Sequence, residues 1–323
     1  MIHLTIRQLL YFEALSHTLH FGRAAEHAGV SQPALSAQIA EMESRLGCKL
    51  FDRGAKGVRL TEDAIALQPR IEKILSAIRD LETVALSGRL ATERRFRLGI
   101  IPTVAPYILP AILAELKARF PALVVELREA VTATLAEEAN AGRIDAFMAA
   151  LPLDYPGLRI EELFGDRFFL GVPADDAMII APPVPPGSPV LERLMLLEEG
   201  HCLRDQALAI CGRVRPVAMA SYGATSLTTL MQMVAHGLGV TLVPEIALAA
   251  ASEMRDLKVV PFAEPAPERR LCLAWRRTSQ RNQECSELAA IIRELHSPAG
   301  ERSILSEELG EVDRIRPEAG VNR

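Results

Sequence analysis

The 323-residue chain lacks most features of membrane, secreted and metal-binding proteins. It has no apolar run of about 18 residues, which excludes a transmembrane helix, and its start lacks the apolar core of a signal peptide. We therefore expect a cytoplasmic protein without membrane contact. The five cysteines are an odd, widely spaced set without a CxxC pair, which argues against a secreted disulfide framework and a zinc site. We expect no metal and no cofactor.

The chain also lacks an excess of positive charge. Its net charge is -5, with 36 Lys and Arg against 41 Asp and Glu, which excludes a uniformly basic nucleic-acid-binding protein. A small basic surface would nevertheless be hidden in such a sum. The length is sufficient for two or three domains.

The first 60 residues are predicted to form short helices followed by a hairpin. Thr5 and Ser31 are suited to cap the first and third helices, and Gly47 is suited to end the third. Segment 50–60, with glycines bounding its tip, has the pattern of a hairpin. This region is small, helical and compact enough to be a domain of its own.

The third helix presents short polar and methyl-bearing side chains away from its core stripe. Glutamine can read adenine, and an alanine methyl can meet a thymine methyl, when such a helix lies against base edges. Basic residues in the hairpin are placed to meet phosphates. The plainer alternative is a small helical domain with an ordinary solvated surface. The candidate DNA-binding residues are Gln32, Pro33, Ala34, Ser36, Gln38, Arg53 and Lys56.

A long helix is predicted from Thr61 to about residue 90. Pro69 lies inside it and is expected to kink or restart it. A narrow apolar stripe of this helix usually faces a second copy of the same helix, although it could pack on its own domain. The stripe alternates at spacings of three and four through Ile71, Ile74, Ile78, Leu81 and Ala85.

From Arg95 onward, short apolar strands alternate with helices, and a second such set runs from Phe168 to about Val260. This rhythm predicts a mostly parallel, doubly wound sheet. Two halves, each with its own sheet, would leave a cleft between them. The tail 299–323 is charged and poor in apolar residues, so we expect it to be loosely ordered.

Cys202 and Cys211 flank a run that is predicted to be helical. Leu203, Ala207 and Ile210 lie at helical spacing and share one face. Nine helical steps of about 1.5 Å place the two cysteine Cα atoms ~13 Å apart. A disulfide needs them within about 7 Å. The two thiols can therefore bond only if the helix unwinds.

A dense set of N-terminal segments carries a family resemblance: Phe21–Ala25, Ser31–Ile39, Met42–Glu43, Leu46–Gly47, Leu50–Arg53 and Leu60–Thr61. They resemble the winged helix–turn–helix of LysR-type transcriptional regulators. Ala64 and His20 depart from the family pattern, and His20 is expected to weaken a helix cap. The resemblance implies an α/β protein with four parts. These are a winged helix–turn–helix domain (1–60), a dimerising linker helix (61–90), a two-lobed regulatory domain like periplasmic binding proteins (91–298) and the tail.

A second resemblance surrounds Cys202. Segment Gly200–Ala207 with Cys211 resembles the hydrogen-peroxide-sensing members of that family, and so do four shorter segments: Ile101–Tyr107, Glu129–Thr132, Ala224–Leu227 and Arg269–Leu271. The resemblance implies that Cys202 is the peroxidatic cysteine and Cys211 the resolving one. It further implies a peroxide pocket near Cys202, with the arginine at 269 or 270, and strand alignment favours 269. The candidate pocket residues are Thr103, Thr132, His201 and Arg269.

The chemistry of these residue types is compatible with such roles. A thiolate is the nucleophile, and the N-terminus of a helix would stabilise it at Cys202. His201 and Arg204 are local donors. Oxidation would give a sulfenic acid and then a disulfide. A hydroxyl such as that of Thr103 both donates and accepts, which suits HOOH, although a threonine after a strand is most often a helix cap.

The resulting hypothesis is a transcription activator, not an enzyme, that senses hydrogen peroxide and induces antioxidant genes. Its expected partners are double-stranded promoter DNA, RNA polymerase, glutaredoxin- or thioredoxin-type reductants and copies of itself in a homodimer or homotetramer. One alternative is a LysR-type regulator that binds a small metabolite in the cleft. Another is a thiol peroxidase, although the peroxiredoxin pattern Pro-x-x-x-Thr-x-x-Cys is missing. Cys48, Cys272 and Cys285 are interpreted as core residues.

Overall fold

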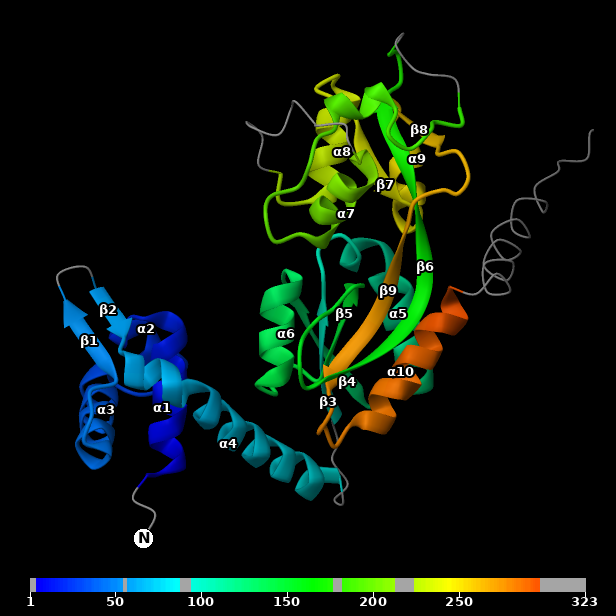
Figure 1. Ribbon diagram of the computed structural model, residues 1–323. Coiled ribbons are helices and arrows are strands. Elements are labelled where there is room, and N and C mark those ends of the chain that lie inside the picture. The colour runs from blue at the N-terminus through cyan, green and yellow to red at the C-terminus, as the bar shows by residue number, and fades with distance from the viewer. Residues whose placement is uncertain (1–3, 55–56, 88–93, 177–181, 213–223, 297–323) are drawn as a thin grey trace, which may run out of the picture. The chain divides into compact units, whose positions relative to one another are not determined.

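The computed structural model describes residues 4–54, 57–87, 94–176, 182–212 and 224–296, and its chain divides into two compact units (Figure 1). The first comprises Met1–Ala91 with Ala141–Arg143, and the second comprises Thr92–Asn140 with Ile144–Arg323. Lys56 and the tail 299–323, about which the sequence makes predictions, lie outside the described residues. Within the described ranges, no helix combines the length and apolarity needed to cross a bilayer.

The first unit is the predicted set of helices and hairpin. Thr5 and Ser31 cap their helices as expected, and Gly47 ends α3 with a left-handed φ of 73°. His20 still caps α2, because its Nδ1 accepts the Arg23 N–H at 3.3 Å. The elements are α1 (Ile6–Thr18), α2 (Phe21–His27), α3 (Gln32–Leu46), β1 (Phe51–Gly54), β2 (Gly57–Leu60) and α4 (Glu62–Ser87).

Helix α4 narrows one expectation, of a kink or a restart at Pro69, and corrects another. It continues through Pro69, so the helix does not restart there. Ile71 is buried beside Leu75 in the core of the first unit, so the predicted seam is wrong at this position. The reason is that the first turns of α4 pack on their own domain. Ile74 and Leu81 are 49% and 69% exposed, and the dimerisation prediction rests on them.

The second unit is built on one path of strands in the order β4-β3-β5-β9-β6-β7, with β8 also paired to β6. Its strands are β3 (Arg94–Ile100), β4 (Leu123–Glu129), β5 (Ala146–Ala150), β6 (Leu158–Pro173), β7 (Thr241–Pro244), β8 (Leu257–Pro261) and β9 (Glu268–Arg276). Its helices are α5 (Ala105–Arg119), α6 (Thr132–Asn140), η1 (Pro189–Arg193), α7 (Cys202–Cys211), α8 (Leu227–Ala235), η3 (Glu245–Ala247), α9 (Leu248–Ser252) and α10 (Asn282–Leu295).

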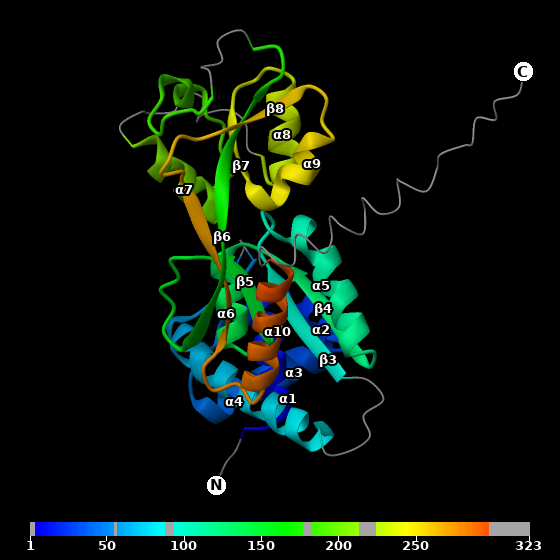
Figure 2. The same cartoon turned by 90° about the vertical axis from the view of Figure 1, so that its right-hand side faces the viewer.

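The strand directions contradict the expectation of a mostly parallel sheet. Strand β3 pairs in parallel with β4 and β5, but β5 with β9, and β6 with β7, β8 and β9, are antiparallel. Strand β6 has 16 residues and serves both halves, with β9 beside it (Figure 2). The halves therefore do not have separate sheets. Apolar runs in a sequence reveal strands but not the direction in which each strand pairs.

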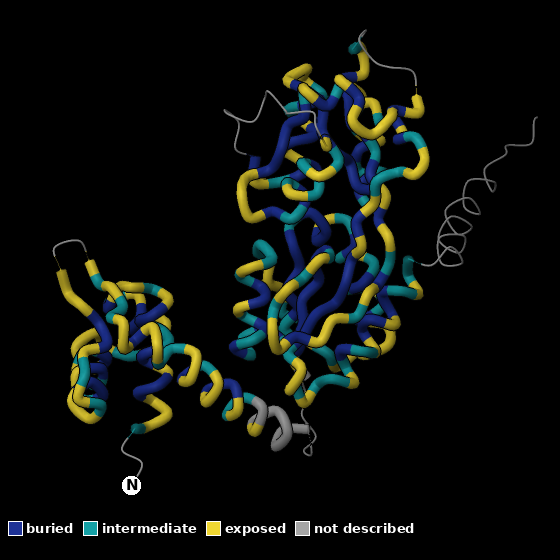
Figure 3. Tube along the Cα trace, viewed as in Figure 1, coloured by how far each residue is buried: buried dark blue, intermediate teal, exposed yellow. Residues whose placement is uncertain are grey.

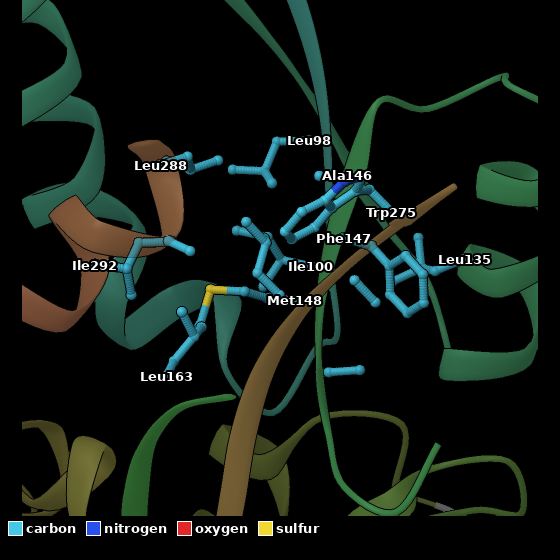
Figure 4. Packing of buried hydrophobic residues seen from close by; sticks show 14 of the residues in the cluster. Leu98, Ile100, Leu135, Ala146, Phe147, Met148, Leu163, Trp275, Leu288 and Ile292 are labelled. Carbon is cyan, nitrogen blue, oxygen red and sulfur yellow. The ribbon is translucent and has the colours of Figure 1, made fainter. Parts of the chain in front are cut away.

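Two hydrophobic cores define two lobes of the second unit. Lobe 1 is the core around β3, β5, α5, α6 and α10, where Ile100, Met148 and Ile292 meet (Figure 4). Strand β5 is buried at every residue, as the dark centre of this lobe in Figure 3 shows. Lobe 2 is the core around β7, β8, α7 and α8. The two-lobed α/β architecture predicted from the sequence is confirmed.

Candidate functional site

Helix α7 connects the two cores through its terminal cysteines. It begins at Cys202 and ends at Cys211, which confirms the predicted helix. Cys202 is half-buried and packs against the lobe 1 core, whereas Cys211 is 1% exposed within the lobe 2 core. Both thiols are free. Since helical geometry separates their Cα atoms by ~13 Å, they cannot bond in this state.

The surroundings of the Cys202 sulfur act in opposite directions on its pKa. Burial raises the pKa of the thiol above its ordinary value, and this effect is the largest. The Arg269 charge lowers it, as do hydrogen bonds from the Ala150 and Leu203 N–H groups and from the Thr132 hydroxyl. The expected stabilisation of the thiolate by the start of the helix is present in the Leu203 N–H, but the net shift is upward.

Arg269 is buried in the centre of this site and is held on two sides. Its Nε donates to Asp166 Oδ2 at 2.8 Å, and its Nη1 donates to Thr103 Oγ1 at 3.1 Å. Its Nη2 donates to the Thr103 carbonyl at 3.1 Å. Arg270 is exposed instead and pairs with Glu162. Position 269 is therefore the one that the fold brings to the site.

Thr103 does not cap the following helix, contrary to the plainer reading of a threonine after a strand. The N-cap of α5 is Val104, which makes no side-chain cap. Thr103 is 1% exposed, and its hydroxyl accepts a hydrogen bond from Arg269 instead. The local sequence pattern could not show this bond, because the arginine comes 166 residues later; only the family resemblance placed the two residues in one pocket.

Thr132 and His201 differ in how the structure places them. Thr132 Oγ1 is buried, and its hydroxyl lowers the pKa of the Cys202 thiol. Among the described residues it has no other hydrogen-bond partner, so it can also serve a small polar ligand. His201 is the N-cap residue of α7 and is buried, and burial lowers its pKa. Within the described chain, no hydrogen bond joins its ring to Thr103, Thr132 or Arg269. Thr132 and Arg269 thus act on the Cys202 sulfur, Thr103 is connected to it through Arg269, and His201 precedes it in the chain.

Two groups of the site were not among the predicted residues. Asp166 is a fully buried carboxylate of β6 on the same inward-facing side as Phe168 and Leu170, and an acidic residue in that alternating apolar series was a usable signal. The Ala150 N–H gave no signal, because every residue except proline has one. Arg204 was expected beside Cys202, but it donates to the Leu197 carbonyl at 2.9 Å.

The predicted DNA-contacting face of α3 is only partly free. Ser36 Oγ accepts from Arg53 Nη2 at 2.9 Å, and that guanidinium lies 4.1 Å from the centre of the Phe21 ring. Gln38 donates to Glu41 at 3.2 Å. Arg53 therefore fastens the hairpin to α2 and α3 while it remains exposed to solvent. The exposed candidates, at the start of the helix, are Gln32, Pro33 and Ala34.

The raised pKa of Cys202 predicts a steep pH dependence for its alkylation in the reduced protein. Because only the thiolate reacts, the rate should rise about tenfold per pH unit between about pH 6 and 8. Peptide mass spectrometry after timed iodoacetamide treatment measures this rate at Cys202 alone. A rate that levels off below about pH 7 would contradict the direction of the shift.

Known proteins resemble this chain over both units. Residues 6–65 match the bacterial regulatory helix-turn-helix protein, lysR family, and residues 91–297 match the LysR substrate binding domain. The chain is 38% identical to a probable hydrogen peroxide-inducible genes activator from Streptomyces viridosporus, over 90% of this chain and 94% of that protein. It is 34% identical to the DNA-binding transcriptional dual regulator OxyR of Escherichia coli, over 90% and 95% of the two chains.

Two solved structures are similar as well. A full-length cysteine-to-aspartate variant of OxyR from Pseudomonas aeruginosa has a TM-score of 0.72 and 31% identity, covering 91% of this chain and 96% of that one. A cysteine-to-serine variant of Corynebacterium glutamicum OxyR with bound hydrogen peroxide has a TM-score of 0.59 and 30% identity, covering 98% and 100%.

Proposed function

We propose, from the premise that this chain belongs to the LysR family of bacterial transcriptional regulators, that a reversible Cys202–Cys211 disulfide makes its DNA binding respond to hydrogen peroxide. The chain is a redox-sensing transcription regulator, and regulation rather than catalysis is its role. One observation carries the proposal. The Cys202 sulfur lies among the buried Thr132 hydroxyl and the charge of Arg269, which in turn holds Thr103.

The chemistry begins with the Cys202 thiolate. It attacks one oxygen of HOOH, the O–O bond breaks, and the departing hydroxide takes a proton to become water. Thr103, Thr132 and Arg269 polarise the peroxide, and His201 lines the approach to it. The Cys211 thiol then displaces water from the sulfenic acid and the S–S bond forms. A glutaredoxin- or thioredoxin-type reductant returns the two electrons.

The disulfide changes the fold because its two ends start too far apart. Helix α7 must unwind, and Cys211 must leave the lobe 2 core. The altered lobe repacks the homodimer or homotetramer and shifts the spacing of paired recognition helices on the promoter. RNA polymerase recruitment and antioxidant gene expression change with it. Such a regulator acts in the cytoplasm, where the chromosome is.

The DNA-contacting residues follow from the same assignment. We place the base contacts at the exposed start and outer face of α3 and the phosphate contacts in the hairpin. The base-reading set is Gln32, Pro33, Ala34, Ser36 and Gln38, and the phosphate-binding set is Arg53 and Lys56. In this scheme residues 1–60 bind DNA, 61–90 dimerise, 91–298 sense and 299–323 form the tail.

Footprinting tests the proposal on the DNA upstream of the protein's own gene. Reduced and peroxide-treated protein should protect different extents of the promoter, and dithiothreitol should reverse the difference. Cys202→Ser should keep the reduced footprint at every peroxide concentration, because serine forms no sulfenic acid. A normal peroxide response from this variant would refute the proposal.

The pairing of the cysteines is tested separately by mass spectrometry of the peroxide-treated protein. A peptide in which Cys202 is joined to Cys211 is expected. A stable bond from Cys202 to Cys272 or Cys285 would overturn the assignment of the resolving cysteine.

A further inference from the structure

A third thiol lies next to the site without belonging to the proposed disulfide. Cys272 is fully buried in β9 and pairs with Ala149 of β5. Its Sγ lies 3.5 Å from the Ala149 carbonyl oxygen, within hydrogen-bonding reach for sulfur. Burial raises the pKa of this thiol to about 12, so it keeps its proton at physiological pH. Cys272 therefore acts only as an S–H donor.

The strand pairing fixes the direction of the Ala149 carbonyl. The Leu151 N–H donates to the Arg270 carbonyl at 2.8 Å. Because hydrogen-bonded and non-bonded pairs alternate along an antiparallel ladder, Ala149 and Cys272 form a bonded pair. The carbonyl therefore points toward β9, where the Cys272 thiol approaches it.

The N–H of the same peptide unit points to the opposite side. On that side β5 is paired with β3, and this pairing ends at Ile100 and Met148. The Ala150 N–H lies beyond the last residue pair of the two strands. This N–H lowers the pKa of the Cys202 thiol, so it lies on the side of the peptide that faces the sulfur. One peptide unit, Ala149–Ala150, thus connects a buried thiol donor with the reactive thiol.

We propose that Cys272 is a positioning residue that increases the reactivity of Cys202 through this peptide. The Cys272 S–H bond polarises the Ala149 carbonyl, which makes the Ala150 N–H a stronger donor to the Cys202 thiolate. Hydrogen bonds in such a chain strengthen one another. The inference rests on the proposed function, in which this thiolate is the group that attacks peroxide.

Substitution of Cys272 tests the relay through the alkylation rate of Cys202. In reduced full-length protein at pH 7, Cys272→Ala should react with iodoacetamide about 1.5- to 4-fold more slowly, from a loss of 10–30% in a charge-assisted bond. Its whole pH profile should move to higher pH. Cys272→Ser keeps a donor at the same place and should restore the wild-type profile.

Cys285 provides the matched control. It is also fully buried in lobe 1, and its Sγ lies 3.8 Å from a carbonyl, that of Asp145. That peptide is not the one that contacts Cys202. Cys285→Ala creates a similar small cavity and should leave the Cys202 profile unchanged. If Cys272→Ala does not fold, Cys272→Val fills the space without a donor and takes its place.

Three results would overturn the relay. They are a wild-type profile in the variant without a donor, equal slowing in Cys272→Ser, or equal slowing in Cys285→Ala. The last two would show that only packing matters. Alkylation requires neither peroxide nor DNA, so the Cys272 relay and the proposed peroxide-sensing function can fail separately. A failed relay would leave the footprints responsive, whereas a failed sensor would leave the alkylation shift in place.

Discussion

Replacing Asp166 with alanine is expected to lower the free energy of unfolding of the second unit by about 3–5 kcal/mol. Asp166 and Arg269 are both fully buried, with Nε and Oδ2 2.8 Å apart. Without the carboxylate, the guanidinium is a buried charge with no opposite charge beside it. The Ile246 N–H also loses its acceptor, Asp166 Oδ1, at 3.2 Å. Urea unfolding followed by circular dichroism measures the loss.

The neighbouring arginine offers a control on the same strand. Arg270 and Glu162 form an ion pair whose side chains are 57% and 47% exposed. Glu162→Ala should therefore cost no more than about 1 kcal/mol. The double variant Asp166→Ala, Arg269→Met should recover part of the loss, since it removes the unpaired charge. An Asp166→Ala variant as stable as Glu162→Ala would contradict the argument.

Peroxide is expected to accelerate hydrogen exchange of the α7 amides by on the order of 100-fold or more, which corresponds to a local loss of about 2.7 kcal/mol. A disulfide brings the Cα atoms of Cys202 and Cys211 within about 7 Å, about half their helical separation. The intervening N–H groups then lose their helical acceptors. Exchange mass spectrometry on reduced and oxidised protein measures the effect.

Two comparisons make this exchange experiment specific. Cys211→Ser can be oxidised at Cys202 but cannot form the disulfide, so its α7 should remain protected. Helix α8 has no cysteine, and it reports general loosening of lobe 2. Protection of α7 in protein shown to contain the Cys202–Cys211 bond would contradict the proposed switch.

Local features of the fold could be predicted because their causes lie within a few residues. A cap needs only Thr5 or Ser31 and an N–H three residues later, and Gly47 supplies its left-handed turn by itself. Helix α7 could be predicted because its residues are good helix formers and its apolar residues recur at helical spacing. The family resemblance added the two lobes, and it also pointed to Thr103 and Arg269, which the structure joins by a hydrogen bond.

The unpredicted features depend on contacts between distant segments. Asp166 and Arg269 are 103 residues apart and meet only because β6 and β9 pair antiparallel. The hydrophobic pattern of each strand does not predict which other strand it pairs with. The prediction that Ile71 faces a second copy of the helix is wrong for a similar reason. A heptad-like apolar stripe shows that a helix packs against something, but not whether that is a second copy or its own domain.

The placement of the two cysteines in different cores links the redox equilibrium to packing. Oxidation under the proposed mechanism withdraws Cys211 and α7 residues such as Leu203 from lobe 2. Each 1.4 kcal/mol of burial lost in this way raises the reduction potential of the pair by about 30 mV, which makes the disulfide easier to reduce. The oxidant level at which the regulator switches is thus adjustable by apolar substitutions that never meet peroxide.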